Sequence, residues 1–210
     1  MIRRWPKARN RHQRLSRVFR RERKTGESVE QDVMVVHSGN RIDHPDRQAP
    51  RFPPDREQAV AARVSALLEA VDPLGVVTAG AAGADLLMIE GALHHDIPVH
   101  LVLPFDPEQF RRISVADQGE GWAERFDRAL DHIAAHPWCS VTTLDLPPDE
   151  SGFRGGNEAL VERALALAPG QVLAVAVRPR NGESERSMTD DFVDRAEAAA
   201  LSVVGIDPRG

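Results

Sequence analysis

The stretch VVTAGAAGADLLMIEGALHHDIPVHLVLPF, residues 76–105, carries the pattern that decides the fold. An apolar run passes through Gly80 and Gly83 into a helical segment, and a second apolar run follows and stops at Pro104. A run that is apolar throughout is typical of a strand buried on both faces, as in a parallel sheet covered by helices. The stretch therefore predicts a strand, a helix and a second strand, with a glycine-containing joint before the helix.

The rest of the chain repeats this alternation. Apolar runs predict strands at 33–37, 74–79, 97–103, 139–145, 171–177 and 201–207, and apolar residues recur at helical spacing in 60–71, 122–133 and 160–167. Strands that alternate with helices form a parallel sheet with helices on both faces. We therefore expect one α/β domain over residues 33–210, a three-layer sandwich around a mostly parallel sheet of about six strands.

Composition limits the class of protein. The chain has 210 residues, 41% of them hydrophobic, which suffices for the core of one domain. Its single cysteine, Cys139, excludes an intramolecular disulfide. No apolar run reaches the roughly 20 residues that span a bilayer. We expect a cytoplasmic protein that does not cross a membrane. No pattern indicates a cofactor or metal, since the adjacent His94 and His95 would point about 100° apart on a helix.

Charge is distributed unevenly along the chain. Residues 1–30 hold 11 of the 27 Lys and Arg but 3 of the 32 Asp and Glu, a net charge of +8 that leaves -13 for the remainder. We expect residues 1–32 to form a basic, disordered arm. Binding of nucleic acid or anionic lipid by this arm is the alternative. The acidic body argues against nucleic acid as the partner.

The joint at residues 80–85 is the first candidate site, because ligands of such sheets bind beyond the carboxyl ends of the strands. Gly80 permits a sharp turn, and Gly83 lets the backbone approach a ligand or the neighbouring strand closely. The N–H groups of the helix start at Ala81 and Ala84 favour an anion. Asp85 either stabilises the helix start or accepts hydrogen bonds from a ribose or an amine. The alternative is a joint with a purely structural role.

The loop HSGNRIDHPDRQAPRFPPDRE, residues 37–57, is the second candidate. Its length indicates a functional or a disordered segment. Ser38, Gly39 and Asn40 offer small hydrogen-bonding groups. Arg41 and Arg51 can pair with phosphate, and the aromatic residue 52 can stack on a base. The alternative is that Asp43, Pro45 and Asp46 build turns and that the arginines are solvated.

Together, SGNRIDHPDRQAPRFP (38–53) and TAGAAGADLLMIEGALHHDIPVHLVLPFDPEQFRRISV (78–115) resemble the SLOG superfamily, named for the SMF/DprA and LOG proteins. The resemblance covers residues 33 to about 208. It implies a Rossmann-like domain that binds a nucleotide or a nucleotide-derived ligand. It adds to the site Pro104, at the end of the third strand, and the helix start at Thr189 and Asp190. Asn157 follows two glycines, where we expect another helix start that lines the same crevice or is simply capped.

One departure from the superfamily concerns catalysis. LOG enzymes release cytokinin bases from riboside monophosphates, and they resemble one another in a Pro-Gly-Gly-x-Gly-Thr-x-x-Glu loop whose glutamate takes part in catalysis. If Thr189 is the matching threonine, the glutamate position falls on Phe192. We therefore expect binding or sensing of the ligand without turnover, and no catalytic residue. The alternative is a hydrolase of the N-glycosidic bond in which Asp85 or Glu158 replaces the glutamate. A homo-oligomer or an attached effector is left open as a partner.

Overall fold

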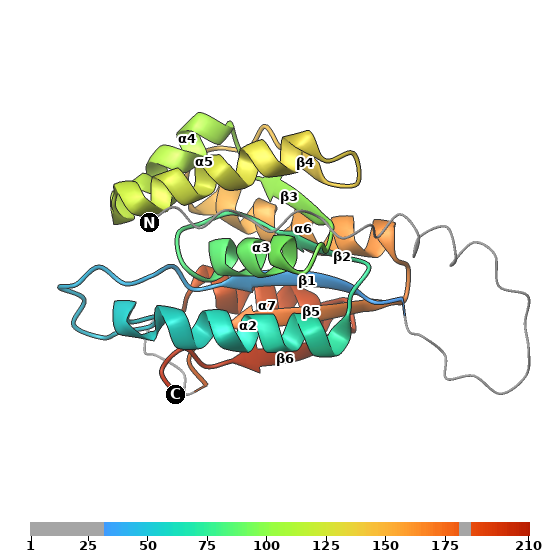
Figure 1. Cartoon of the computed structure of the whole chain (residues 1–210), viewed down its shortest axis with the longest axis horizontal. Coiled ribbons are helices and arrows are strands. Elements are labelled where there is room, and N and C mark those ends of the chain that lie inside the picture. The colour runs from blue at the N-terminus through green and yellow to red at the C-terminus, as the bar shows by residue number, and fades with distance from the viewer. Residues whose placement is uncertain (1–31, 181–185) are drawn as a thin grey trace, which may run out of the picture.

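The computed structural model describes residues 32–180 and 186–210 (Figure 1). The expectation of a disordered basic arm concerns residues that, apart from residue 32, lie outside the described ones. The strands are β1 (Met34–Gly39), β2 (Gly75–Thr78), β3 (Val99–Leu103), β4 (Ser140–Thr143), β5 (Val172–Val177) and β6 (Ser202–Ile206). The α-helices are α2 (Glu57–Val71), α3 (Ala84–His94), α4 (Pro107–Ser114), α5 (Glu120–Ala135), α6 (Glu150–Leu167) and α7 (Met188–Ala198), with 3-10 turns η1 (Pro54–Arg56) and η2 (Ala116–Gln118).

The six strands form one sheet in the order β4-β3-β2-β1-β5-β6, and every neighbouring pair is parallel. The chain builds the sheet outward from β1 to β4 and then returns to the other side of β1 to add β5 and β6. The order therefore reverses between β1 and β5. This architecture confirms the predicted α/β sandwich with a parallel, Rossmann-like sheet.

Helices cover both faces of the sheet because each central strand is apolar on both sides. In β1, Val35 belongs to the core that contains residues of α2, α3 and α5, whereas its neighbour Val36 belongs to the core that contains residues of α6 and α7. Both side chains are fully buried. The reversal of strand order moves the last two helices to the second face, as right-handed crossovers require. Figure 1 shows α2 in front of β5 and β6, with α7 behind them.

Helix α6 begins earlier than the sequence predicts. Asp149 is its N-cap and accepts hydrogen bonds from the N–H groups of Ser151 and Gly152, so Asn157 lies inside the helix and not at its start. A β-carbon on Gly152 would lie 1.8 Å from the carbonyl oxygen of Pro147. Glycine is thus required at position 152 of α6 because the preceding loop packs directly on the helix backbone.

None of the helices in residues 32–180 and 186–210 is both long enough and apolar enough to cross a membrane.

Candidate functional site

The candidate site lies at the carboxyl edge of the sheet, where the strand order reverses between β1 and β5. Ligands of open α/β sheets bind in the crevice that such a reversal opens. In Figure 1 this edge is on the left, where the loop after β1 projects from the sheet. Asn40 directly follows β1, and its N–H donates to the carbonyl oxygen of Val177 at the end of β5, at 2.8 Å. Ser38 is buried and lies in register with Ala176 of β5.

The start of α3 closes against the loop after β1. The N–H of Ala84 donates to the carbonyl oxygen of Asn40 at 3.2 Å, and the N–H of Ile42 donates to the carbonyl oxygen of Ala82 at 2.9 Å. Gly83 has φ 117°, and a β-carbon there would lie 2.3 Å from the nitrogen of Ile42. The close approach that the sequence predicts at Gly83 is therefore made by the chain's own backbone.

The buried side chain of Asp85 stabilises this joint through two hydrogen bonds to backbone N–H groups. Its carboxylate accepts the N–H of Gly39 at 3.1 Å on Oδ1 and the N–H of Ala81 at 3.2 Å on Oδ2. The side chain is buried, and burial raises its pKa to about 7 in spite of both hydrogen bonds and of the nearby Arg41. Of the two roles that the sequence left open, the geometry places this carboxylate at the helix start.

A neutral histidine lies beside Asp85. Nδ1 of His37 is 3.1 Å from Oγ1 of Thr78 and 3.5 Å from Oδ1 of Asp85. Complete burial lowers the pKa of His37 to about 3, so the imidazole is neutral at pH 7 and its contact with Asp85 is not an ion pair. Nε2 of His37 is buried and makes no hydrogen bond within the described residues.

Helix α7 begins beside the loop that follows β1. Ser187 caps it and forms a reciprocal capping box with Asp190. The hydroxyl of Thr189 is buried and donates to Oδ1 of Asn40 at 3.0 Å, which joins α7 to the loop after β1. Arg178, the residue that follows β5, pairs with Asp190 through Nη1. The structure thus brings Asn40, Thr189 and Asp190 together at the reversal point.

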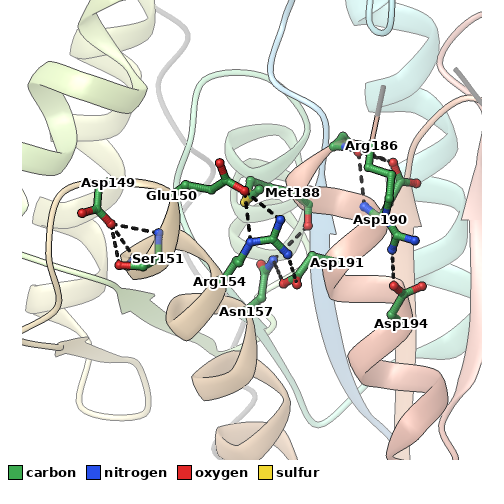
Figure 2. A network of polar contacts seen from close by, with 12 residues as sticks. Asp149, Glu150, Ser151, Arg154, Asn157, Arg186, Met188, Asp190, Asp191 and Asp194 are labelled. Atoms are coloured by element: carbon green, nitrogen blue, oxygen red, sulfur yellow. Dashed lines mark hydrogen bonds and ion pairs between the residues drawn. The ribbon is translucent and has the colours of Figure 1, made fainter. Parts of the chain in front are cut away.

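Asp191 connects α7 to α6 (Figure 2). Its carboxylate accepts hydrogen bonds from Nη1 of Arg154 at 2.9 Å, from Nδ2 of Asn157 at 3.0 Å and from Nε of Arg195 at 3.0 Å. The amide of Asn157 also donates to the carbonyl oxygen of Met188 at 2.9 Å. These hydrogen bonds hold the pKa of Asp191 below its usual value although burial acts in the opposite direction. Asn157 therefore reaches the site from the middle of α6.

Several residues of the predicted site have other surroundings. A β-carbon on Gly80 would meet the ring of Phe126 on α5 at 3.0 Å, and one on Gly156 would meet Pro104 at 3.2 Å. Gly80 and Pro104 thus pack against helices on opposite faces of the sheet. The N–H of Arg51 donates to Oδ2 of Asp43 at 2.7 Å.

The loop after β1 is organised by Asp43, as the structural alternative predicts. Its Oδ2 accepts the N–H groups of Arg51 at 2.7 Å and Phe52 at 2.6 Å. Phe52 is completely buried in the core, so the prediction that it stacks on a base is wrong. Arg41 pairs with Asp117 of η2.

Two cations of the site, Arg154 and Arg178, are absent from the sequence prediction. Arg178 follows β5 directly, so examining the first residue after every predicted strand would have found it. Nothing in the sequence indicates Arg154 in this way. It contacts α7 from the first turns of α6, and the sequence predicts that this helix starts only near Asn157.

Two further features lie apart from the crevice. An open hollow of about 580 Å³ runs along α4 and contains no residue of the predicted site; its lining is Asp106, Glu108, Gln109, Arg111, Arg112 and Ala116. Within residues 32–180 and 186–210, no group of three or more His, Cys, Asp or Glu side chains is arranged to hold a metal ion.

No family model and no curated protein matches the chain. Among solved structures it is similar to the X-ray structure of DNA processing protein A (DprA) from Streptococcus pneumoniae, at 14% sequence identity and a TM-score of 0.38. The match covers 83% of this chain and 59% of that chain, so this chain spans less than two thirds of its length. Similarity at this level does not show what this chain binds.

The matched protein is nevertheless a DNA-processing protein. On this finding we correct the expectation that nucleic acid is an unlikely partner. The physical reason is that net charge describes the whole body and not a local surface. Arginines gather around the start of α7 although the body as a whole is acidic.

Proposed function

We propose that the chain is a SLOG-type domain that binds a nucleotide-derived ligand, such as a nucleoside phosphate or an ADP-ribose-like compound, without hydrolysing it. One observation carries the proposal: two guanidinium groups, those of Arg154 and Arg178, are held at the first turn of α7 by Asp191 and Asp190. A helix start favours an anion, and guanidinium groups pair with phosphate through two parallel hydrogen bonds.

The position of the ligand follows from the reversal of strand order. The phosphate would lie over the first turn of α7, and the nucleoside would extend along the loop after β1, past Asn40 and Arg41. The start of α3 is a poorer anion site than the sequence predicts, because the N–H of Ala84 already donates to the carbonyl oxygen of Asn40. Both guanidinium groups would have to exchange a carboxylate for the phosphate, which limits affinity.

We also propose that the bound ligand is not hydrolysed. Phe192, at the position that the resemblance gives to the LOG glutamate, is completely buried. The two carboxylates named as replacements are engaged elsewhere: Asp85 accepts two backbone N–H groups, and Glu158 pairs with Arg195 at 3.0 Å. A pKa near 7 would suit Asp85 for acid–base chemistry, but its burial keeps it from a substrate.

The test is titration calorimetry with AMP, ADP-ribose, NAD and a short single-stranded DNA, followed by chromatography of each mixture for free base. We expect binding of at least one nucleotide with no released adenine. The Arg178→Ala and Arg154→Ala variants should each lose about 1.5–3 kcal/mol of binding free energy, as expected for a hydrogen bond between charged groups. Arg128→Ala is the matched control, because Arg128 pairs with Glu124 on the exposed face of α5.

The outcomes separate the alternatives. Release of free base would establish the hydrolase. Binding of the DNA without binding of any mononucleotide would replace the proposed ligand by nucleic acid. If the parent, Arg154→Ala and Arg178→Ala bind a nucleotide with equal affinity, the phosphate does not bind at the start of α7. Arg41→Ala and Arg51→Ala are also expected to weaken binding, and this remains a prediction from the sequence.

A further inference from the structure

A polar patch lies near the amino end of β3, on the face of the sheet that α6 covers. His100 of β3 is in register with Ser140 of β4, so the two side chains point to the same face. Val102 shares that face, because it lies two residues after His100, and it belongs to the core that contains residues of α6. Nδ1 of His100 is 2.9 Å from Oγ of Ser140. Both side chains are partly exposed, so the patch is open to solvent near the edge of the sheet.

Helix α6 places Arg163 over this patch. The helix returns from the carboxyl end of β4 to the amino end of β5, so it runs antiparallel to β3. Gly156 lies seven residues before Arg163 on the same side of α6, and a β-carbon there would lie 3.2 Å from Pro104, which follows β3. From Gly156 to Arg163 the helix rises about 10 Å, and from Pro104 back to His100 the chain spans about 13 Å. Arg163 therefore lies near His100.

The pKa of His100 reflects the same arrangement. Burial lowers this pKa below its ordinary value, and the positive charge of Arg163 lowers it further. A nearby cation disfavours the protonated imidazole, because it repels the second positive charge. The imidazole of His100 is therefore neutral at pH 7, and the guanidinium of Arg163 is the charge beside it.

The guanidinium of Arg163 has an unused donor. Its Nε is buried and makes no hydrogen bond within the described residues. Nε of Arg41 is in the same condition, but the guanidinium of Arg41 pairs with Asp117. Arg163 forms no ion pair with any residue in 32–180 or 186–210. Aspartates or glutamates pair with many other arginines of the body, among them Arg111, Arg125, Arg154, Arg178 and Arg195. A buried donor without an acceptor is unfavourable, so this guanidinium favours a ligand that supplies oxygen atoms.

We propose that Arg163, Ser140 and His100 form a binding site for phosphate or a phosphate monoester. The guanidinium donates Nε–H and one Nη–H to two oxygens of the anion, in the paired geometry that arginine forms with phosphate. The hydroxyl of Ser140 donates to a third oxygen. Nδ1–H of His100 donates to Oγ of Ser140 and so orients the hydroxyl. A carboxylate has two oxygens, whereas a tetrahedral oxyanion has one for each of the three donors.

This site is independent of the crevice at the carboxyl edge of the sheet. His100 lies on the amino side of β3, about 13 Å of strand away from Pro104, so both sites can be occupied at once. The proposal therefore does not rest on the function proposed above. The competing explanation is a hydrated arginine with a purely structural role. A hydrated arginine predicts that added anions change nothing at His100 beyond the effect of ionic strength.

The test follows the imidazole signals of the full chain by NMR while inorganic phosphate is added to about 10 mM, ten times the dissociation constant of a millimolar site. His100→Gln identifies the signal of His100. We expect phosphate to shift this signal and to raise the pKa of His100, because a bound anion offsets the charge of Arg163. Sodium chloride at equal ionic strength is the blank. A His100 signal that responds to phosphate no more than to chloride overturns the proposal.

Arg163→Gln tests whether the response depends on the guanidinium. In this variant the pKa of His100 should be raised already without phosphate, and phosphate should no longer change it. Arg112→Gln is the matched control, because Arg112 is an exposed arginine of α4, and it should respond as the parent does. Arg178→Ala should also keep the response, so a failure of the proposed site at α7 is distinguishable from a failure here. A response at His100 that persists in Arg163→Gln overturns the site.

Two further ligands define the chemistry of the site. Acetate should shift the His100 signal less than phosphate, and an equal shift overturns the assignment to a tetrahedral oxyanion. Ribose 5-phosphate distinguishes the source: tighter binding than that of inorganic phosphate supports an organic phosphate, and equal or weaker binding supports free phosphate. If Arg163→Gln fails to fold, Arg163→Lys replaces it. This variant keeps the charge and loses the paired N–H groups, so it should bind phosphate about tenfold more weakly. Equal affinity of the parent and Arg163→Lys overturns the proposed geometry.

Discussion

The hydroxyl of Thr189 donates to Oδ1 of Asn40 across 149 residues of sequence, at 3.0 Å and in a buried position. Asn40 directly follows the first strand and Thr189 lies in the first turn of the last helix, so this hydrogen bond closes the fold at the point where the strand order reverses. The backbone N–H of Asn40 also donates to the carbonyl oxygen of Val177 at the end of β5. The candidate crevice is therefore held by a contact between the first and the last βα units.

Thr189→Val is expected to destabilise the protein because it leaves the buried Oδ1 of Asn40 without its donor. An unsatisfied buried acceptor costs about 1–3 kcal/mol in the free energy of unfolding. Urea denaturation monitored by circular dichroism measures the change. Thr189→Ser, which keeps the hydroxyl, is the control and should lose less. Equal midpoints for the two variants would show that the hydrogen bond contributes nothing to stability.

Gly83→Ala is expected to destabilise the fold more than Gly119→Ala. Both glycines are N-cap residues with positive φ, 117° and 110°, so both substitutions strain the backbone. Only the β-carbon at 83 meets other atoms, 2.3 Å from the nitrogen of Ile42, whereas the one at 119 has nothing within 4 Å. The difference should be about 1–3 kcal/mol, the usual cost of overpacking. Thermal unfolding of the two variants gives it, and equal losses would place the whole cost in the backbone angle.

The contact at Gly83 makes this glycine necessary for the fold itself. From sequence, Gly80 permits a sharp turn, and Gly83 lets the backbone approach either a ligand or the neighbouring strand. The fold assigns the close contact at Gly83 to the loop after β1, and such a contact between residues 41–42 and 83 leaves no local signal.

The strands were predictable because a parallel sheet buries both faces of each strand. Residues 171–177 were predicted, and β5 runs from Val172 to Val177. The same reasoning from sequence placed the candidate site at the carboxyl ends of the strands, and its position as a binding site stays a prediction. Which individual residues belong to the candidate site could not be predicted from the sequence. Phe52 and Arg51 are neighbours in one polar loop, yet Asp43 turns that loop so that the phenyl ring enters the core.

Arg125→Lys is expected to destabilise the protein by about 1–2 kcal/mol, because one guanidinium makes contacts that an ammonium cannot. Arg125 donates to both carboxylate oxygens of Glu90, at 2.7 and 2.6 Å, and to Glu57 at 2.7 Å. Its guanidinium also lies 4.0 Å from the ring centroid of Trp122. These contacts join α2, α3 and α5. Chemical denaturation of Arg125→Lys measures the loss.

Arg128→Lys is the matched control for this network. Arg128 lies on the same helix, is 56% exposed and pairs with Glu124 at 3.6 Å. Exposed pairs of this kind contribute about 0–1 kcal/mol, so the substitution should be nearly neutral. A loss at Arg128 as large as that at Arg125 would argue that helix propensity, and not the network, sets the cost.

The last prediction concerns the dependence of stability on pH. Burial raises the pKa of Asp85 to about 7 from 3.8, so between those values the folded protein holds a proton that the unfolded chain has released. Asp85 therefore lowers the free energy of unfolding as pH rises from about 4 to 7. Burial lowers the pKa of His37 to about 3 from 6.5, so below pH 6.5 the unfolded chain takes up a proton that the folded protein does not. His37 thus lowers the free energy of unfolding as pH falls.

In the window from about pH 4 to 6.5 the two contributions oppose each other, so removing either residue should expose the other. Asp85→Asn should cost more at pH 5 than at pH 7, by up to about 1.4 kcal/mol per pH unit, because only the parent gains stability from the proton on Asp85. His37→Gln should show the opposite trend and cost less as pH falls, since the variant no longer loses stability through the histidine. Urea denaturation of the parent and both variants in half-unit steps from pH 4.5 to 7.5 measures these slopes. Curves that run parallel for all three proteins would show that neither group titrates differently in the folded and unfolded states.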